Sequence, residues 1–515
     1  MPISQITRLF ALVKSMDKSE KRHFRLYVNR LESNEDVLYV KLFDHLDKAN
    51  SLNEIDLKSK LGIVSTSQYS NLKRHLYAQV LKSLRLVYVS KEKVIAIREL
   101  MDYATVLYNK SLFTESRLIL SKASALVDEI QDYTLGFEVI EHQKKIASLL
   151  ISNNVTDASN LKNLMESSKQ AQAKFNSSCT LSNLVLMTQS LKHQFTFVKN
   201  EREQNLLFEF YHSNFQRIDI NSLQFYTRVQ WFKAHYLFNH MCLNFQLSYK
   251  YALNWNRAFE HSPTMKSLYF EAYIEGLHYI LQILFFLNNK RRFKKWFNLL
   301  KTSAYSQNHK PSKTIDQQKF LFFQTAQLNK AIIYNNFTSI DAITKLISEQ
   351  VITFADSIGS DTIVAFYYKF GLVYSYKGNY EKAIDCFNKI VVESSDKSNH
   401  IYYSYARLAL LICHFRQGHF QFVDNTLQNV RQTFNSNQLT NKPVDIVLSF
   451  LRRGCRAMNF GIQDDYTDVI SKLKKHENNH FEKVAFLYYN FIGLFESLSE
   501  NDTIEKTLNK KINAH

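Results

Sequence analysis

The sequence VAFYYKFGLVYSYKGNYEKAIDCFNKI, residues 364–390, contains two helical patterns that meet at Gly378. Residues at the spacing of one helix face are Tyr367, Phe370, Gly371 and Tyr374 in the first pattern, and Tyr380, Ala383, Phe387 and Ile390 in the second. Gly371 and Ala383 have the small side chains that let two helix backbones approach closely. The stretch therefore predicts two antiparallel helices with aromatic side chains packed between them.

This pattern resembles a tetratricopeptide repeat, a helix–turn–helix unit that stacks on its neighbours. The residues that match the repeat are Tyr367, Phe370, Gly371, Tyr374, Ala383 and Phe387. Ile390 and Ser395 depart from it, since the repeat has a small residue and Pro at these positions. The chain is also similar to the Lys-, Asn- and Tyr-rich tetratricopeptide proteins of Bacteroidota. The resemblance implies a solenoid that binds other macromolecules.

The composition favours helices throughout the chain. The 515 residues include ten Gly and four Pro, whereas average usage would give roughly 36 Gly and roughly 26 Pro. Strand turns and long loops depend on these residues, so their scarcity indicates few of either. We predict an all-α fold, an α-solenoid of stacked antiparallel helix pairs with a small helical N-terminal domain.

The sequence also bears on where the protein resides. No stretch approaches the roughly 18 consecutive apolar residues that a membrane span requires. The N-terminus lacks a basic region followed by an apolar core. The five cysteines are Cys179, Cys242, Cys386, Cys413 and Cys455, and no two of them have Cys-x-x-Cys spacing. This pattern indicates free thiols in a reducing compartment. We expect a cytoplasmic protein that makes no membrane contact.

The helical patterns suggest a division into two parts. Residues 1–90 are predicted to form a helical N-terminal domain, and residues 91–515 an irregular tetratricopeptide-like solenoid. The clearest repeats are 364–397 and 404–437. Elsewhere the patterns predict separate helices over 155–175 and 180–198, and one helix over 479–498.

In tetratricopeptide solenoids, the first helix of each pair lines a concave groove, and the resemblance assigns groove positions here. We expect partner contacts from Tyr368, Lys369, Leu372, Ser375, Tyr376, Tyr405, Leu408, Ile412, Phe415 and Arg416. A groove of aromatic side chains with a few cations suits an extended peptide or a helix. If these side chains are open, replacing Tyr376 and Phe415 by Ala should weaken binding without changing thermal stability.

A second hypothesis concerns nucleic acid. Leu57, Leu61, Gly62, Ile63, Tyr69 and Leu72 resemble the apolar frame of a DNA-binding helix-turn-helix motif. No Asp or Glu occurs between Asp56 and Glu92. A helix over 68–89 would present possible phosphate-binding side chains at Arg74, His75, Lys82 and Arg85. The alternative is an ordinary helical cap with a basic exposed face.

A basic segment without acids, Gly276 to Ile315, interleaves cations with Phe293, Trp296 and Phe297. Such a segment could hold single-stranded nucleic acid. We favour a structural role, since Phe293 and Trp296 fit core positions of a second helix.

The sequence His476-Glu477-Asn478-Asn479-His480 has the His-Glu-x-x-His spacing of zinc peptidases. Its polar surroundings indicate a turn rather than a buried helix, so we expect no metal there. The sequence also contains neither a Gly-rich phosphate-binding loop nor the Gly-x-Ser-x-Gly motif of serine hydrolases. We expect a non-enzymatic scaffold or adaptor without cofactors, whose partner is a protein or peptide, or alternatively a regulator that contacts DNA or RNA.

Overall fold

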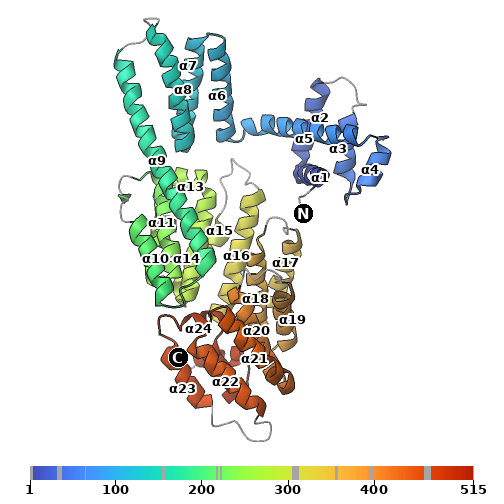
Figure 1. Cartoon of the computed structure of the whole chain (residues 1–515), viewed down its shortest axis with the longest axis vertical. Helices are drawn as coiled ribbons and strands as arrows, with labels where there is room; N and C mark the ends of the chain where they lie inside the picture. Colours follow the sequence, from blue (N-terminus) through green and yellow to red (C-terminus); the bar gives the residue numbers. More distant parts are fainter. Residues whose placement is uncertain are drawn as a thin grey trace. The chain divides into compact units, whose positions relative to one another are not determined.

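The computed structural model describes residues 4–31, 38–63, 65–152, 158–215, 219–220, 223–303, 313–353, 358–393, 400–456 and 466–513. These residues form 26 α-helices and no β-strand (Figure 1). The all-α prediction is therefore confirmed. None of these helices combines the length and the apolar character that spanning a membrane requires. The chain divides into two compact units, Met1–Asn176 and Ser177–His515, which we call the N-terminal and C-terminal units.

The N-terminal unit contains a cluster of buried side chains between Ile6 and Val80, drawn from its first helices. Leu57, Leu61, Ile63 and Tyr69 belong to it, so the predicted helix-turn-helix frame is core. Gly62 turns the chain with a left-handed φ of 65°. The predicted boundary at residue 90 falls within this unit, at the end of α5. Its helices are α1 (Gln5–Ser15), α2 (Lys18–Leu31), α3 (Leu38–Lys48), α4 (Glu54–Lys60), α5 (Thr66–Val89), α6 (Lys93–Asn109), α7 (Phe113–Ile130) and α8 (Tyr133–Ser152).

The C-terminal unit is a series of packed helices around one continuous hydrophobic core between Leu181 and Ile504. From α11 to α23 each helix packs against the next, and α12 packs with α14, α14 with α16 and α18 with α20. This arrangement is that of a solenoid, in which stacking buries faces that no single pair could cover. Its helices through α17 are α10 (Glu201–Asn214), α11 (Phe225–Met241), α12 (Phe245–Glu260), α13 (Pro263–Leu268), α14 (Phe270–Phe286), α15 (Lys290–Thr302), α16 (Lys313–Tyr334) and α17 (Ile340–Thr353). The later ones are α18 (Ser360–Lys377), α19 (Tyr380–Glu393), α20 (His400–Arg416), α21 (Phe420–Ser436), α22 (Lys442–Arg456), α23 (Tyr466–His476), α24 (Val484–Tyr488), α25 (Phe491–Ser499) and α26 (Ile504–Asn513).

The pair α18 and α19 is the helix pair predicted from residues 364–390. Gly378 lies between them with a left-handed φ of 84°, a conformation that favours Gly. A Cβ atom added at Gly371 would lie only 2.5 Å from the ring of Phe387. Phe387 is fully buried. The close approach expected at Gly371 is therefore present, with the Phe387 ring filling the space that a side chain would need.

Two segments differ from the predicted helix boundaries. The helices expected over 155–175 and 180–198 are one helix, α9 (Ala158–Phe195), which has neither Gly nor Pro to end it. Conversely, the helix expected over 479–498 is interrupted between α24 and α25, where Tyr489 is extended (φ −145°, ψ 138°). This interruption lies among the predicted groove residues.

Candidate functional site

The predicted groove residues lie on α18 and α20, as expected, but most of them are not open. Those less than a tenth exposed are Tyr368, Leu372, Ser375, Tyr376, Tyr405, Leu408, Ile412 and Phe415, while Lys369 and Arg416 are half-buried. The expectation of an open aromatic groove at these positions is therefore wrong. The physical reason is packing within the chain: residues 488–490 contact Tyr368, Ser375, Tyr376 and Tyr405, and Phe415 packs against Phe420 and Phe450.

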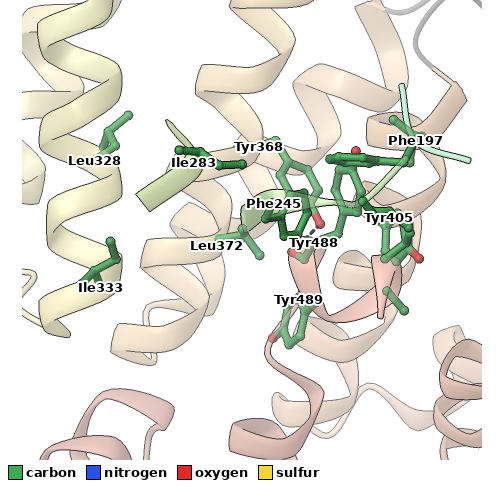
Figure 2. Packing of buried hydrophobic residues seen from close by; sticks show 14 of the residues in the cluster. Phe197, Phe245, Ile283, Leu328, Ile333, Tyr368, Leu372, Tyr405, Tyr488 and Tyr489 are labelled. Atoms are coloured by element: carbon green, nitrogen blue, oxygen red, sulfur yellow. Dashed lines mark hydrogen bonds between the residues drawn. The ribbon is translucent and has the colours of Figure 1, made fainter. Parts of the chain in front are cut away.

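The segment of residues 488–490 is held by hydrogen bonds from α18. The Tyr368 hydroxyl donates to the carbonyl of Tyr488 (2.9 Å), and the Asn490 N–H donates to the Tyr376 hydroxyl oxygen (2.9 Å). Figure 2 shows Tyr488 beside Tyr368 and Tyr405, with this first hydrogen bond dashed. Buried backbone groups need partners, and here side chains of α18 supply them where the helix stops. The interruption is thus stabilised by the residues expected to bind a partner.

Further contacts fix the same segment. The Tyr488 ring stacks on Tyr405 with ring centroids 4.6 Å apart. The hydroxyl groups of Tyr489 and Ser375 lie 2.8 Å apart in a buried hydrogen bond. The Asn490 side chain accepts from the Gly493 N–H (2.9 Å) and so caps α25. Residues 488–490 therefore fill this part of the solenoid interior.

Arg416, another predicted groove residue, forms hydrogen bonds within the chain. Its Nε donates to the Tyr380 hydroxyl (2.7 Å) and its second guanidinium nitrogen to the carbonyl of Asp502 (2.6 Å). These bonds tie α20 to α19 and to the loop before α26. Arg416 is therefore engaged within the chain.

Other side chains of the same unit, either polar or aromatic, remain half-buried. We call this set the inner wall, and its members are Lys192, His278, Phe322, Lys369 and Tyr402. The His278 ring stacks on Phe322 with centroids 4.2 Å apart. Tyr402 packs against Tyr368 at 5.2 Å. Helices α9, α14, α16, α18 and α20 each contribute one member.

The two lysines of the inner wall have neutral neighbours. Lys369 donates to Asn329 Oδ1 (2.5 Å), and its Nζ lies 5.6 Å from the centre of the Phe285 ring. The Lys192 Nζ lies 5.3 Å from the centre of the Tyr279 ring. Among the described residues neither lysine is in an ion pair with a carboxylate, whereas neighbouring Lys233 pairs with Glu275 (2.6 Å). The inner wall therefore holds positive charge that the described side chains do not fully balance.

Burial also acts on the ionisation of these groups. Burial lowers the pKa of Lys369 to about 8. Burial likewise lowers the pKa of Lys192 to about 8, although the charge of Glu275 opposes this change. Burial, and then the charges of Lys192 and Lys369, lower the pKa of His278 to about 3. Both lysines are thus close enough to His278 for their charges to act on it, and an anion bound there would favour their charged forms.

An apolar pocket of about 610 Å³ lies next to the inner wall. It starts one helical turn beyond Lys369 on α18 and Asn329 on α16. The residues that line it include Phe285, Phe286, Ile332, Ile333, Leu372, Tyr376, Phe486, Leu487, Tyr488 and Leu508. Two of the predicted groove residues, Leu372 and Tyr376, therefore face a cavity even though the rest of the predicted groove is filled.

Sequence reasoning missed most of the inner wall. Lys192 and His278 belong to helices without a clear repeat pattern, and only contacts between distant helices bring them near Lys369. A usable signal was present in α14, where Glu271, Glu275 and His278 recur on one face of an otherwise apolar helix. Polar residues on an apolar helix often mark an inward-facing functional surface.

The residues predicted to contact nucleic acid, Arg74, His75, Lys82 and Arg85, lie on α5 and are exposed. Arg85 pairs with Asp102 (2.8 Å) and Arg74 donates to Asn71 (2.6 Å). The His75 ring packs edge-on against Tyr39. Among the described residues, none forms a hydrogen bond or an ion pair with the Lys82 side chain. This face is available to a partner, and Arg85 already has a carboxylate partner.

The basic segment 276–315 and the His476–His480 sequence are the remaining two motifs, and neighbouring residues explain how each is placed. Phe293, Trp296 and Phe297 are buried, which agrees with the structural role favoured for the basic segment, although residues 304–312 lie outside the described part of the chain. Helix α23 ends at His476, so His476 and His480 do not share a helix face. His480 contacts Gln204 instead (3.4 Å). Within the described residues, His, Cys, Asp and Glu form no group that could hold a metal ion.

A buried His in the core gives a testable pH dependence. Burial, followed by the charge of Lys192, lowers the pKa of His240 well below its ordinary value, and neither ring nitrogen has a hydrogen-bond partner among the described residues. Below about pH 6.5 the unfolded chain binds a proton there that the folded chain does not, so the free energy of unfolding falls as pH falls. We expect His240→Phe to lose less stability than wild type between pH 7.5 and 5.5 in urea unfolding.

The matched control for this prediction is His261→Phe at an exposed position. If His240→Phe and His261→Phe show the same pH dependence as wild type, His240 is not the titrating group.

Comparisons with models of protein families, with curated proteins and with solved structures found nothing that matches this chain.

Proposed function

We propose that this chain is a non-enzymatic, tetratricopeptide-like scaffold or adaptor of the cytoplasm that binds a protein or peptide partner along the inner wall of its C-terminal unit. The observation that carries the proposal is the inner wall itself. It combines half-buried aromatic rings with two lysines whose charge no described carboxylate neutralises in an ion pair. Aromatic side chains together with cations are suited to binding a peptide segment.

The packing of residues 488–490 supports this reading. Here α18 binds an extended piece of backbone through the Tyr368 and Tyr376 hydroxyl groups. On the same helix, Lys369 of the inner wall directly follows Tyr368. A scaffold that already holds one extended segment in this way can hold another beside it. Free thiols at the described cysteines fit a reducing compartment.

Site-specific photo-crosslinking tests the proposal. A benzoylphenylalanine placed at Phe322, on the inner wall, is expected to crosslink a protein when the full chain is incubated in native lysate. The matched control is the same residue at Leu346, which is 42% exposed on α17. Crosslinking from position 322 that does not exceed crosslinking from position 346 would refute the proposed surface.

A second candidate is contact with DNA or RNA through α5. The observation that favours it is the exposed position of Arg74 and Lys82, two turns apart on one helix face. Electrophoretic shifts of duplex DNA and of single-stranded RNA by the full chain, at about 50 mM and about 200 mM salt, test it. If the contact exists, Arg74→Gln with Lys82→Gln should weaken binding, and Lys345→Gln on α17 should not.

A further inference from the structure

The apolar pocket of the C-terminal unit has the dimensions of a small-molecule site. Its volume of about 610 Å³ lies within the roughly 300–1,000 Å³ typical of such sites. Its walls come from distant parts of the chain: α14, the start of α15, α16 and α18, together with α24, residues 489–490 and α26. Apolar side chains dominate these walls, so an occupant must be largely apolar.

One polar side chain in the wall, Asn335, is only partly satisfied by the described residues. Asn335 is only 4% exposed. Its Nδ2 donates to the Glu505 carbonyl (2.7 Å), which fixes the amide orientation. Its Oδ1 accepts no hydrogen bond among the described residues. A buried acceptor without a donor is costly, so a ligand that carries an N–H or O–H group would satisfy it.

Two cations complete the lining. The ammonium group of Lys511 is already paired with Glu496. Lys290 is half-buried, and among the described residues no carboxylate pairs with it. The Lys290 carbonyl accepts from the Tyr334 hydroxyl (2.8 Å), and both Lys290 and Asn335 line the pocket. The charge available to a ligand is therefore positive.

We propose that this pocket binds a small, largely apolar acid that also carries one hydrogen-bond donor. Its apolar body lies against Phe286, Ile332 and Leu372, its donor meets Asn335, and its negative group meets Lys290. This site is separate from the proposed partner surface, because the pocket and the inner wall are lined by different residues.

Two dyes with matched rings test the proposal. 1-Anilinonaphthalene-8-sulfonate has an apolar body, an N–H donor and a negative sulfonate, and N-phenyl-1-naphthylamine has the same rings and N–H without the charge. We expect the full chain to bind both saturably, as measured by fluorescence titration. In Lys290→Gln the Kd of the sulfonate dye should rise about tenfold, the loss of one charge-assisted contact, while the Kd of the neutral dye should stay within about twofold.

Filling the pocket supplies the second part of the test. Ile332→Trp should abolish binding of both dyes, and Leu508→Trp fills the pocket from α26 if the first variant does not fold. The controls are Lys294→Gln, an exposed lysine of the same helix as Lys290, and Leu346→Trp at an exposed position. The proposal is overturned if neither dye binds, if both filling variants bind as wild type does, or if Lys290→Gln weakens both dyes equally.

Discussion

Phe387→Ala is expected to lower the free energy of unfolding by about 3–5 kcal/mol, the cost of removing a fully buried aromatic ring and leaving a cavity. The ring fills the space beside Gly371, where an added Cβ would lie 2.5 Å away. It also contacts Tyr368 edge-on, with ring centroids 5.8 Å apart. Urea unfolding of the full chain, followed by circular dichroism, measures the loss.

A double-mutant cycle isolates the contact between the two residues. Gly371→Ala should destabilise the wild-type chain, because its methyl group collides with the Phe387 ring. In the Phe387→Ala background the same change should cost less or become stabilising, since the ring is gone and Ala favours the helix by about 1 kcal/mol over Gly. Gly359→Ala is the control, because beyond its chain neighbours no atom of the described residues lies within 4 Å of an added Cβ. Equal costs in both backgrounds would show that Gly371 and Phe387 do not interact.

The α18–α19 pair could be predicted because its signals are local. Helix-face spacing, Gly378 at the turn and Gly371 opposite Phe387 all lie within residues 364–390, and adjacent helices in a solenoid pack on their sequence neighbours. Similarly, the beginning of α5 was predicted within two residues. Where the chain has no Gly or Pro, as between residues 158 and 195, the pattern alone did not reveal that one helix continues.

The groove could not be predicted from the same signals. Helix spacing shows which face of α18 turns inward, but it does not show what fills the interior. The occupant, residues 488–490, lies more than a hundred positions later, and its interruption of the helix depends on hydroxyl groups of Tyr368 and Tyr376. The inner wall could not be predicted for the same reason, because Lys192 and Lys369 approach His278 only after the intervening helices have stacked. Lys369 was identified as a groove residue, and its neutral partner Asn329 was not.

Replacing Tyr376 and Phe415 by Ala is therefore expected to destabilise the protein, which reverses the expectation for an open groove. Tyr376 is 5% exposed, accepts from the Asn490 N–H and packs edge-on against Tyr489. Phe415 is 9% exposed and packs against Phe420 and Phe450. Truncating each ring should cost about 3–5 kcal/mol, and Tyr376→Ala should in addition leave the Asn490 N–H without its acceptor.

Two further variants separate ring packing from the hydrogen bond. Tyr376→Phe keeps the ring and removes only the acceptor, so it should cost about 1–3 kcal/mol. Phe422→Ala removes a ring that is 48% exposed on α21 and should change the free energy of unfolding by no more than about 0.5 kcal/mol. If the Tyr376→Ala and Phe415→Ala double variant melts like Phe422→Ala, the C-terminal segment does not pack on α18 and α20 in solution. The predicted groove would then be open, and these two aromatic residues would again be candidates for partner binding.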